Sequence, residues 1–285
     1  MDWYPAPAKL NLFLHVLGRR EDGYHLLQTA FRLIDRADRV GIALRDDGEI
    51  RRIDVTAGVC PETDLCLRAA QLLHELAFAR LGQSAATLGA DLGLEKCLPI
   101  GGGLGGGSSD AATVLLVLNR LWSLNLSREA LMQAGLRLGA DVPVFVYGLN
   151  ALGEGIGERL TPLSLPPAWY LVLMPQVSVS TNEIFSSPAL TRDTKPLKML
   201  PFLPGRGKND LQPVATSLYP AVAAHLEWLS QHGDARMTGS GACVFAEFGT
   251  EAEARDVEAR LPGGMRGFVS RGLDQHPLRD WAVDV

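Results

Sequence analysis

The chain has 285 residues, a formal net charge of -5 at pH 7 and 47% hydrophobic residues. This length can hold two domains or one large one, and the composition is that of a folded, enzyme-sized protein, which excludes a disordered or fibrous chain. Lysine and arginine are scattered along the sequence without a basic stripe, so we expect no nucleic-acid partner. A small anionic ligand remains compatible with this charge balance.

The cysteines and histidines show no spacing typical of a metal site. Cys60, Cys66, Cys97 and Cys243 form no C-x-x-C pair and no H-E-x-x-H group occurs, so we expect reduced thiols and no metal ion held by the protein. The N-terminus carries an acidic residue where a signal peptide has basic ones. Residues 160–182 are uncharged but contain prolines that would break a membrane-spanning helix. We therefore expect a cytoplasmic protein that does not bind membranes.

The first elements in chain order alternate between strand and helix patterns. Residues 9–18 place leucine or valine at every second position and predict a strand with one strongly apolar face, its polar residues pointing the other way. Residues 40–55 form two alternating runs about Asp47-Gly48, which predicts a hairpin. Residues 64–82 predict a helix that ends at a glycine. The first hundred residues are thus predicted to be α+β.

A glycine-rich stretch, PIGGGLGGGSSDAA at residues 99–112, follows next. A strand-like run, EKCLPI, precedes it, and residues 110–122 are apolar nearly all round, which predicts a buried helix whose first turn begins near Ser108 and Ser109. A flexible linker would instead be flanked by polar residues and separate complete folding units. The two serines suit simple N-capping of the helix, a role compatible with ligand binding.

Consecutive glycines allow several backbone N–H groups to converge on one anion, and the helix N-terminus adds its positive dipole. This loop lacks the lysine of a Walker motif and the downstream acid of a dinucleotide-binding fingerprint. We interpret it as a cradle for a di- or triphosphate. Mg²⁺ would arrive with such a nucleotide.

Beyond the loop, residues 127–139 predict a second helix and residues 140–148 a short buried strand, which places Asp141 at a helix-to-strand corner. The proline-rich segment at 161–167 predicts a boundary between residues 1–160 and 161–285. The second half is predicted to be an α/β sandwich in outline. Its expected elements are strands at 169–175, 243–248 and 267–270, helices at 218–233 and 250–261, and a second glycine loop at 238–242.

The stretch LPIGGGLGGGSSDAA resembles the phosphate loop of the GHMP kinases, whose common form is P-x-x-x-G-L-G-S-S-A-A. Further motifs of that family have counterparts in the same order: PAKLNLFLHVLGRREDGYHLLQT at 7–29, LGADVPVF at 138–145 and RMTGSGACVFAEF at 236–248. Asp110 stands where the family more often has alanine. The resemblance implies a two-domain α+β GHMP kinase fold, with a ribosomal-protein-S5-like, ATP-binding N-terminal domain and an α/β-sandwich C-terminal domain on either side of a cleft.

The resemblance also implies an ATP-dependent phosphotransferase acting on an alcohol group. Asp141 would be the base that takes the proton from the substrate hydroxyl, and Lys9 would stabilise the ionised carboxylate. From the residues alone, a corner residue and a solvated strand residue remain equally open for these two positions. The residues matched to ATP binding are Pro99, Ile100, Gly101, Gly102, Gly103, Leu104, Gly105, Gly106, Gly107, Ser108 and Ser109.

The additional glycine pair before the serines resembles the branch of the family that phosphorylates the 2-hydroxyl of a cytidine diphosphate sugar alcohol in the non-mevalonate isoprenoid route. There, residues matching Tyr24 and His25 hold the cytosine ring by stacking and hydrogen bonding, and Phe185 would close its other side. Asn11 and Thr181 would lie near this substrate. The second glycine loop would border the site through Thr238, Gly239, Ser240 and Gly241.

Two other functions stay open at this point. One is a GHMP kinase for another small alcohol, such as homoserine, mevalonate or a sugar, and the other is a catalytically silent nucleotide-binding regulator. The resemblance to the cytidine branch through DGYH and Phe185 favours a cytidine acceptor, and the presence of Lys9 and Asp141 argues against a silent protein. A contribution of Lys96 and Lys208 to nucleotide or diphosphate binding is open, but nothing in their spacing distinguishes them from surface lysines.

Overall fold

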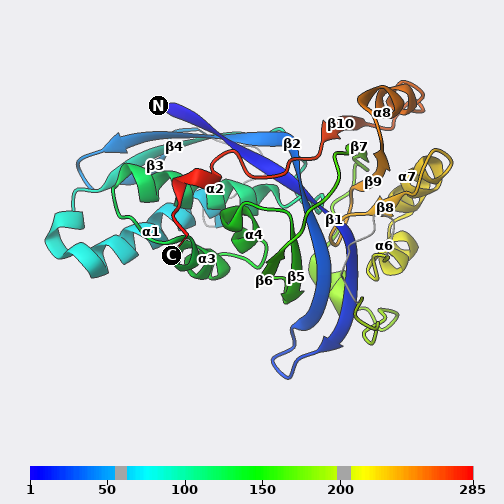
Figure 1. The fold of residues 1–285 in the computed structure, drawn as a ribbon, viewed down its shortest axis with the longest axis horizontal. Coiled ribbons are helices and arrows are strands. Elements are labelled where there is room, and N and C mark those ends of the chain that lie inside the picture. The colour runs from blue at the N-terminus through cyan, green and yellow to red at the C-terminus, as the bar shows by residue number, and fades with distance from the viewer. Residues whose placement is uncertain (55–62, 198–206, 285) are drawn as a thin grey trace.

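Two β-sheets, each covered by helices, make up the described part of the chain, residues 1–54, 63–197 and 207–284 of a computed structural model (Figure 1). Cys60 lies outside these residues. Two long antiparallel strands, β1 (Asp2–Arg19) and β2 (His25–Arg45), run together along the N-terminal half and on beside the C-terminal half. Both halves of the molecule therefore pack against this strand pair.

The first sheet has the order β3-β4-β2-β5-β6, with β1 paired to β2 beside this path. β2 pairs with β4 over residues 39–45 and with β5 over residues 27–31, so two strands pair with successive parts of one edge of β2. The other strands are β3 (Ile50–Arg52), β4 (Gly89–Glu95), β5 (Ala151–Gly155) and β6 (Arg159–Pro162).

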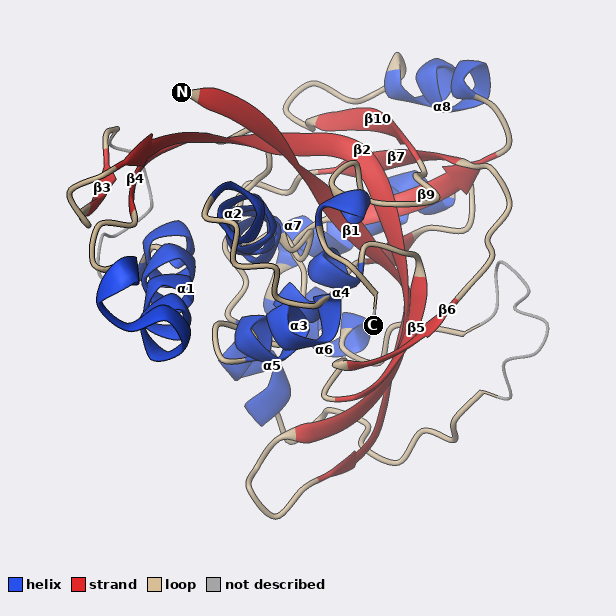
Figure 2. Cartoon of the chain, turned by 60° about the vertical axis from the view of Figure 1, so that its left-hand side comes forward, coloured by secondary structure: helices blue, strands red, loops and turns tan. Residues whose placement is uncertain are grey.

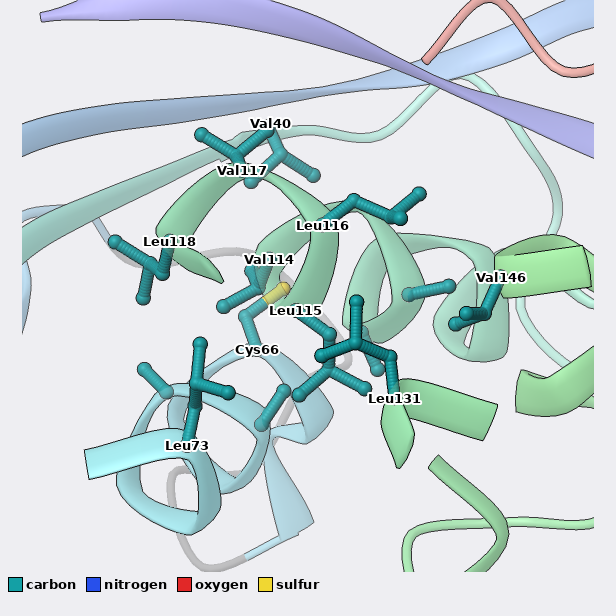
Figure 3. Packing of buried hydrophobic residues seen from close by; sticks show 14 of the residues in the cluster. Val40, Cys66, Leu73, Val114, Leu115, Leu116, Val117, Leu118, Leu131 and Val146 are labelled. Atoms are coloured by element: carbon teal, nitrogen blue, oxygen red, sulfur yellow. The ribbon is translucent and has the colours of Figure 1, made fainter. Parts of the chain in front are cut away.

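Helices cover one side of this sheet, with α2 at their centre (Figure 2). All residues of α2 from Ser109 to Asn119 are buried, as the apolar run predicts. Its side chains pack between α1, α3 and α4, against Leu73, Leu131 and Val146 among others (Figure 3). The helices are α1 (Leu65–Leu81), a 3-10 helix η2 (Gly82–Ala85), α2 (Gly106–Leu121), α3 (Arg128–Leu136) and α4 (Val142–Tyr147).

The second sheet is antiparallel, with the order β10-β7-β9-β8. Leu10 and Phe13 of β1 belong to one buried cluster with Tyr170 of β7 and Phe245 of β9, so apolar packing joins the two sheets. Its strands are β7 (Trp169–Leu173), β8 (Arg236–Met237), β9 (Val244–Phe248) and β10 (Gly267–Arg271). The helices of this half are α5 (Thr181–Ser186), α6 (Gln212–Leu218), α7 (Pro220–Ser230) and α8 (Glu251–Glu258), the last opened by the expected capping box.

The end of the chain returns to the first half. The backbone N–H of Leu273 donates to the carbonyl of Leu33 at 2.8 Å, and that of Arg128 donates to Val283 at 2.9 Å. A 3-10 helix, η3 (Arg279–Trp281), packs against α2. A division of the chain at residue 160 stays a prediction, and these contacts show that the last residues lie against the N-terminal half.

The predicted hairpin about Asp47-Gly48 is wrong. The turn reverses the chain with Gly48 at a φ of 76°, but β3 pairs in parallel with β4, and β4 occupies the edge of β2 over 39–45. β4, which is distant in sequence, therefore pairs with β2 where the local pattern predicts that β3 would pair. Such pairing depends on tertiary packing and leaves no signal in the alternation of the two runs.

Residues 140–148, predicted as a strand, contain helix α4 instead. Pro143 lies in the first turn, where a backbone N–H has no partner within the helix, so the missing N–H of proline costs no hydrogen bond. Gly148 ends the helix at a φ of 70°. A short apolar run is compatible with a buried helix or a buried strand, and here the helix prevails. Asp141 consequently occupies the position before the helix, at the positive end of its dipole.

The predicted strand at 9–18 exists within β1, but its polar face is not exposed. Lys9, Asn11 and His15 are all buried, because β1 is covered on both faces. Within the described ranges, no helix has both the length and the apolar character needed to cross a bilayer.

Candidate active site

Two cavities share a wall in the middle of the molecule. The larger one, about 800 Å³, lies beside the β1–β2 turn and α5, and the smaller one, about 400 Å³, is lined by the glycine-rich loop. The residues that line both cavities are Gly103, Ser108, Asp141, Thr181 and Ser240. Every one of these was matched to the site from the sequence.

The glycine-rich loop connects β4 to α2. Gly101, Gly103 and Gly105 have φ angles of 70°, 76° and 72°, a region that side chains with a Cβ rarely adopt. Gly105 precedes the first turn of α2 in this conformation and caps it with no side chain, so the first N–H groups of the helix are available to a ligand. The helix begins at Gly106, earlier than the sequence predicts.

The two serines therefore do not cap α2 as simple N-cap residues. The Ser109 hydroxyl donates to the carbonyl of Pro7 at 2.7 Å, is fully buried, and lines neither cavity. Ser108 lines both cavities. All of the loop residues from Pro99 to Gly107 line the smaller cavity.

The second glycine loop lies directly against the first. The backbone N–H groups of Ala242 and Cys243 donate to Gly101 and Gly102 at 3.3 and 3.1 Å. A Cβ placed on Gly103 would lie 2.2 Å from the Thr238 carbonyl oxygen, so only glycine permits this approach. Thr238 is buried, while Gly239 and Ser240 line the larger cavity and Ser240 and Gly241 the smaller one.

Lys9 is held at the shared wall by three groups. Its ammonium lies 3.2 Å from Oδ2 of Asp141 and donates to Oδ1 of Asn11 at 2.6 Å and to the Gly103 carbonyl at 3.0 Å. The Asn11 amide in turn donates to Oγ1 of Thr29 at 2.9 Å, which fixes its orientation. Lys9 is thus buried and ion-paired, and the alternative of a solvated strand residue is wrong.

Asp141 stands before α4 but makes no side-chain capping bond, so a purely local role for its carboxylate is not observed. Its side chain is 38% exposed, towards both cavities. A carboxylate that has one cationic neighbour and an open side can accept a hydrogen bond or a proton from a ligand. The arrangement suits general base chemistry.

Aromatic side chains form the far end of the larger cavity. The His25 and Phe185 rings have centroids 4.9 Å apart at an interplanar angle of 33°, and Tyr24 lies nearby with 60% of its surface exposed. Burial, followed by the charges of Arg192 and Arg19, lowers the pKa of His25. Near the shared wall, the Thr181 and Ser240 hydroxyls are hydrogen-bonded at 2.7 Å.

A charged cluster beside the glycine-rich loop was not predicted. The Lys96 ammonium bonds both Asp38 and Asp110, the latter at 2.9 Å, and Asp38 also accepts from the backbone N–H groups of Cys97 and Leu98 at 2.6 and 2.8 Å. Burial raises the pKa of Asp110 to about 7 against the lowering effect of Lys96. Lys96 is therefore no surface lysine, and its only sequence signal was its place beside the loop.

Lys208, by contrast, is 63% exposed and pairs with Asp210 at 3.0 Å. It lines neither cavity. The surface position expected for this lysine is confirmed.

Family models agree with this geometry. The model of the GHMP kinases N terminal domain matches residues 64–149, and the model of the GHMP kinases C terminal domain matches residues 198–266. A crystal structure of mevalonate kinase shares the fold at a TM-score of 0.66, covering 96% of this chain and all of that one at 15% identity. The fold and the site define the GHMP class of kinases, and the α+β GHMP kinase fold is confirmed.

Closer relatives narrow the assignment. The 4-diphosphocytidyl-2-C-methyl-D-erythritol kinase of Thiobacillus denitrificans is 60% identical over 281 residues, covering 99% of each chain. That of Nitrosomonas europaea is 56% identical over 284 residues, covering 99% of this chain and 100% of its own. A crystal structure of 4-(cytidine 5'-diphospho)-2C-methyl-D-erythritol kinase superposes at a TM-score of 0.81 with 33% identity, covering 95% of this chain and 99% of that one. The chain belongs to this family of kinases.

Proposed function

We propose that the protein transfers the γ-phosphoryl group of ATP to the 2-hydroxyl of 4-(cytidine 5'-diphospho)-2-C-methyl-D-erythritol, a step of isopentenyl diphosphate synthesis by the non-mevalonate pathway. The observation that carries this proposal is the shared wall of the two cavities, on which Asp141 lies with Lys9 paired to it from the larger cavity. A phosphoryl transferase needs its two substrates held in separate places that meet at the reacting atoms.

ATP would occupy the smaller cavity. The backbone N–H groups of the phosphate loop and the positive end of α2 suit a triphosphate without a Walker lysine. Mg²⁺ would arrive bound to ATP, and Ser108 at the shared wall is the side chain best placed to reach it or the γ-phosphate. ATP would be bound by Pro99, Ile100, Gly101, Gly102, Gly103, Leu104, Gly105, Gly106, Gly107, Ser108 and Ser109, the last through its backbone.

Asp141 would act as the general base. Its carboxylate takes the proton of the 2-hydroxyl as that oxygen forms a bond to the γ-phosphorus, and the bond from phosphorus to the leaving oxygen breaks to release ADP. The Lys9 ammonium lies against the carboxylate and offsets negative charge on the transferring group. Asn11 and Gly103 hold Lys9 in this place.

The acceptor would occupy the larger cavity. Tyr24, His25 and Phe185 would hold the cytosine ring, while Asn11 and Thr181 would face its sugar alcohol and diphosphate. Stacking on an aromatic side chain is worth about 1–3 kcal/mol per base, which is enough to orient a small nucleotide. The second glycine loop, Thr238 to Gly241, would close the site from the C-terminal half.

A coupled assay of ADP release tests the proposal. The cytidine compound is compared with homoserine, galactose and mevalonate in the presence of Mg²⁺, and we expect turnover with the cytidine compound alone. Turnover with another alcohol would instead favour a different GHMP kinase. No turnover above background with the cytidine compound, in folded protein that binds ATP, would overturn the proposed substrate.

A further inference from the structure

Arg192 anchors the aromatic end of the larger cavity with every nitrogen of its guanidinium group. Nε donates to Nε2 of His25 at 3.1 Å. Nη2 donates to the carbonyls of Phe185 and Ser187 at 2.9 and 2.8 Å, and Nη1 to that of Leu190 at 3.1 Å. One side chain therefore binds both His25 and the backbone of Phe185, whose rings are in contact.

This contact decides which nitrogen of His25 carries the proton. A guanidinium group only donates, so the ring nitrogen that faces it must be an acceptor without a proton. Burial, the charge of Arg192 and the charge of Arg19 all lower the pKa of His25 and so oppose a second proton on the ring. The neutral ring consequently carries its proton on Nδ1.

The Nδ1 atom is available to a ligand. It makes no hydrogen bond to any residue that the structure describes, and it is not one of the nitrogens buried without a partner. His25 also lines the larger cavity. His25 therefore presents a fixed N–H donor to the cavity, beside the Phe185 ring.

We propose that Arg192 is a positioning residue that holds His25 as an Nδ1 donor and thereby selects cytosine over uracil. The inference rests on the proposed function, which puts the pyrimidine of the acceptor at this end of the cavity. Ring atom N3 of cytosine is an acceptor, whereas N3 of uracil carries a proton and is a donor. A fixed donor pairs with the first and opposes the second, so the discrimination includes a repulsive element.

Without Arg192 the imidazole could take either tautomer. It would then donate to N3 of cytosine or accept from N3 of uracil, and the preference between the two bases would fall. A purely structural role for Arg192 has a different signature. It would weaken the binding of both bases by the same factor.

The kinetic test compares kcat/KM for the cytidine acceptor and for its uridine counterpart. In Arg192→Met we expect the ratio between the two to fall by about tenfold, since one unpaired donor costs of the order of 1.4 kcal/mol. The control variant is Lys195→Met, which removes a positive charge from an exposed position in the same segment and should leave the ratio unchanged. An unchanged ratio in Arg192→Met would overturn the proposal.

A second measurement does not depend on catalysis. In ¹⁵N-histidine-labelled wild-type protein, with the His25 signals assigned from their loss in His25→Gln, we expect shifts typical of a protonated Nδ1 and a bare Nε2. A protonated Nε2 would overturn the proposal even if Arg192→Met fails to fold. If neither acceptor is phosphorylated, the proposed function fails, while this spectrum still decides the tautomer.

Discussion

The Lys9 ammonium and the Asp141 carboxylate face each other at 3.2 Å, one buried and the other open to both cavities. The exposed carboxylate is therefore available to a substrate, while its cationic partner stays fixed by Asn11 and Gly103. Asp141→Asn keeps the shape of the side chain but removes its basicity. We expect turnover to fall by about 10²–10⁴-fold or more with ATP affinity nearly unchanged.

Single-turnover rates and a nucleotide titration of the same Asp141→Asn preparation separate these two effects. A large loss of ATP binding would mark Asp141 as a structural residue instead.

The contact between the two glycine loops can be tested at Gly103. Alanine there would require a φ of 76° and would place a Cβ 2.2 Å from the Thr238 carbonyl oxygen. We expect Gly103→Ala to lose at least about 1–2 kcal/mol of unfolding free energy and to bind ATP more weakly. Gly263→Ala is the matched control, because its Cβ would meet no atom within 4 Å. Equal melting temperatures for the two variants would contradict the close approach.

Tyr24 provides a test of acceptor binding that leaves the fold intact. With 60% of its surface exposed, it contributes little to the core. Tyr24→Ala should raise KM for the cytidine acceptor by about fivefold to a hundredfold, as expected for the loss of one stacking contact, while KM for ATP and the melting temperature stay unchanged. An unaltered KM for the acceptor would remove the stacking role.

Asp110 makes stability depend on pH. Its pKa in the folded protein is raised to about 7, chiefly by burial, so the folded state binds this proton more tightly than the unfolded chain does. The stability from this proton is complete at pH below the unfolded pKa of about 4 and is lost as pH rises towards 7. Asp110→Asn escapes this loss and leaves Lys96 paired with Asp38.

The melting temperature of Asp110→Asn relative to wild type should therefore be higher at pH 8 than at pH 5. Asp193→Asn, an exposed aspartate, serves as the control and should show no such trend. A difference that stays constant from pH 5 to pH 8 would contradict this prediction and would mean that Asp110 is ionised throughout this range, compensated by Lys96.

Much of the site could be predicted because it consists of contiguous motifs. The phosphate loop, the DGYH segment and the TGSGA loop carry glycines and polar groups whose geometry is local, and the structure brings their residues to two adjoining cavities. The buried state of Lys9 could not be predicted from the pattern, since it depends on contacts of its ammonium with Asp141 and Gly103, which are distant in sequence. The role of Lys9 is predicted by the resemblance to the GHMP kinases more than by the periodicity of the strand.

The residues that sequence reasoning missed act through long-range contacts. Lys96 appears unremarkable until folding brings Asp38 and Asp110 to it from β2 and α2. Arg192 likewise meets His25 across 167 positions. The misplaced hairpin has the same cause, because β4 enters from a distance between β2 and β3. Local patterns predict elements well but leave such partnerships open.

The shared wall between the cavities has a consequence for the order of events. If ATP and the acceptor occupy the two cavities, both can be bound at the same time. The phosphoryl group can then pass directly from ATP to the acceptor, without a covalent intermediate on a side chain. Reciprocal plots of initial rate at several fixed levels of the second compound should then intersect, where a two-stage exchange would give parallel lines.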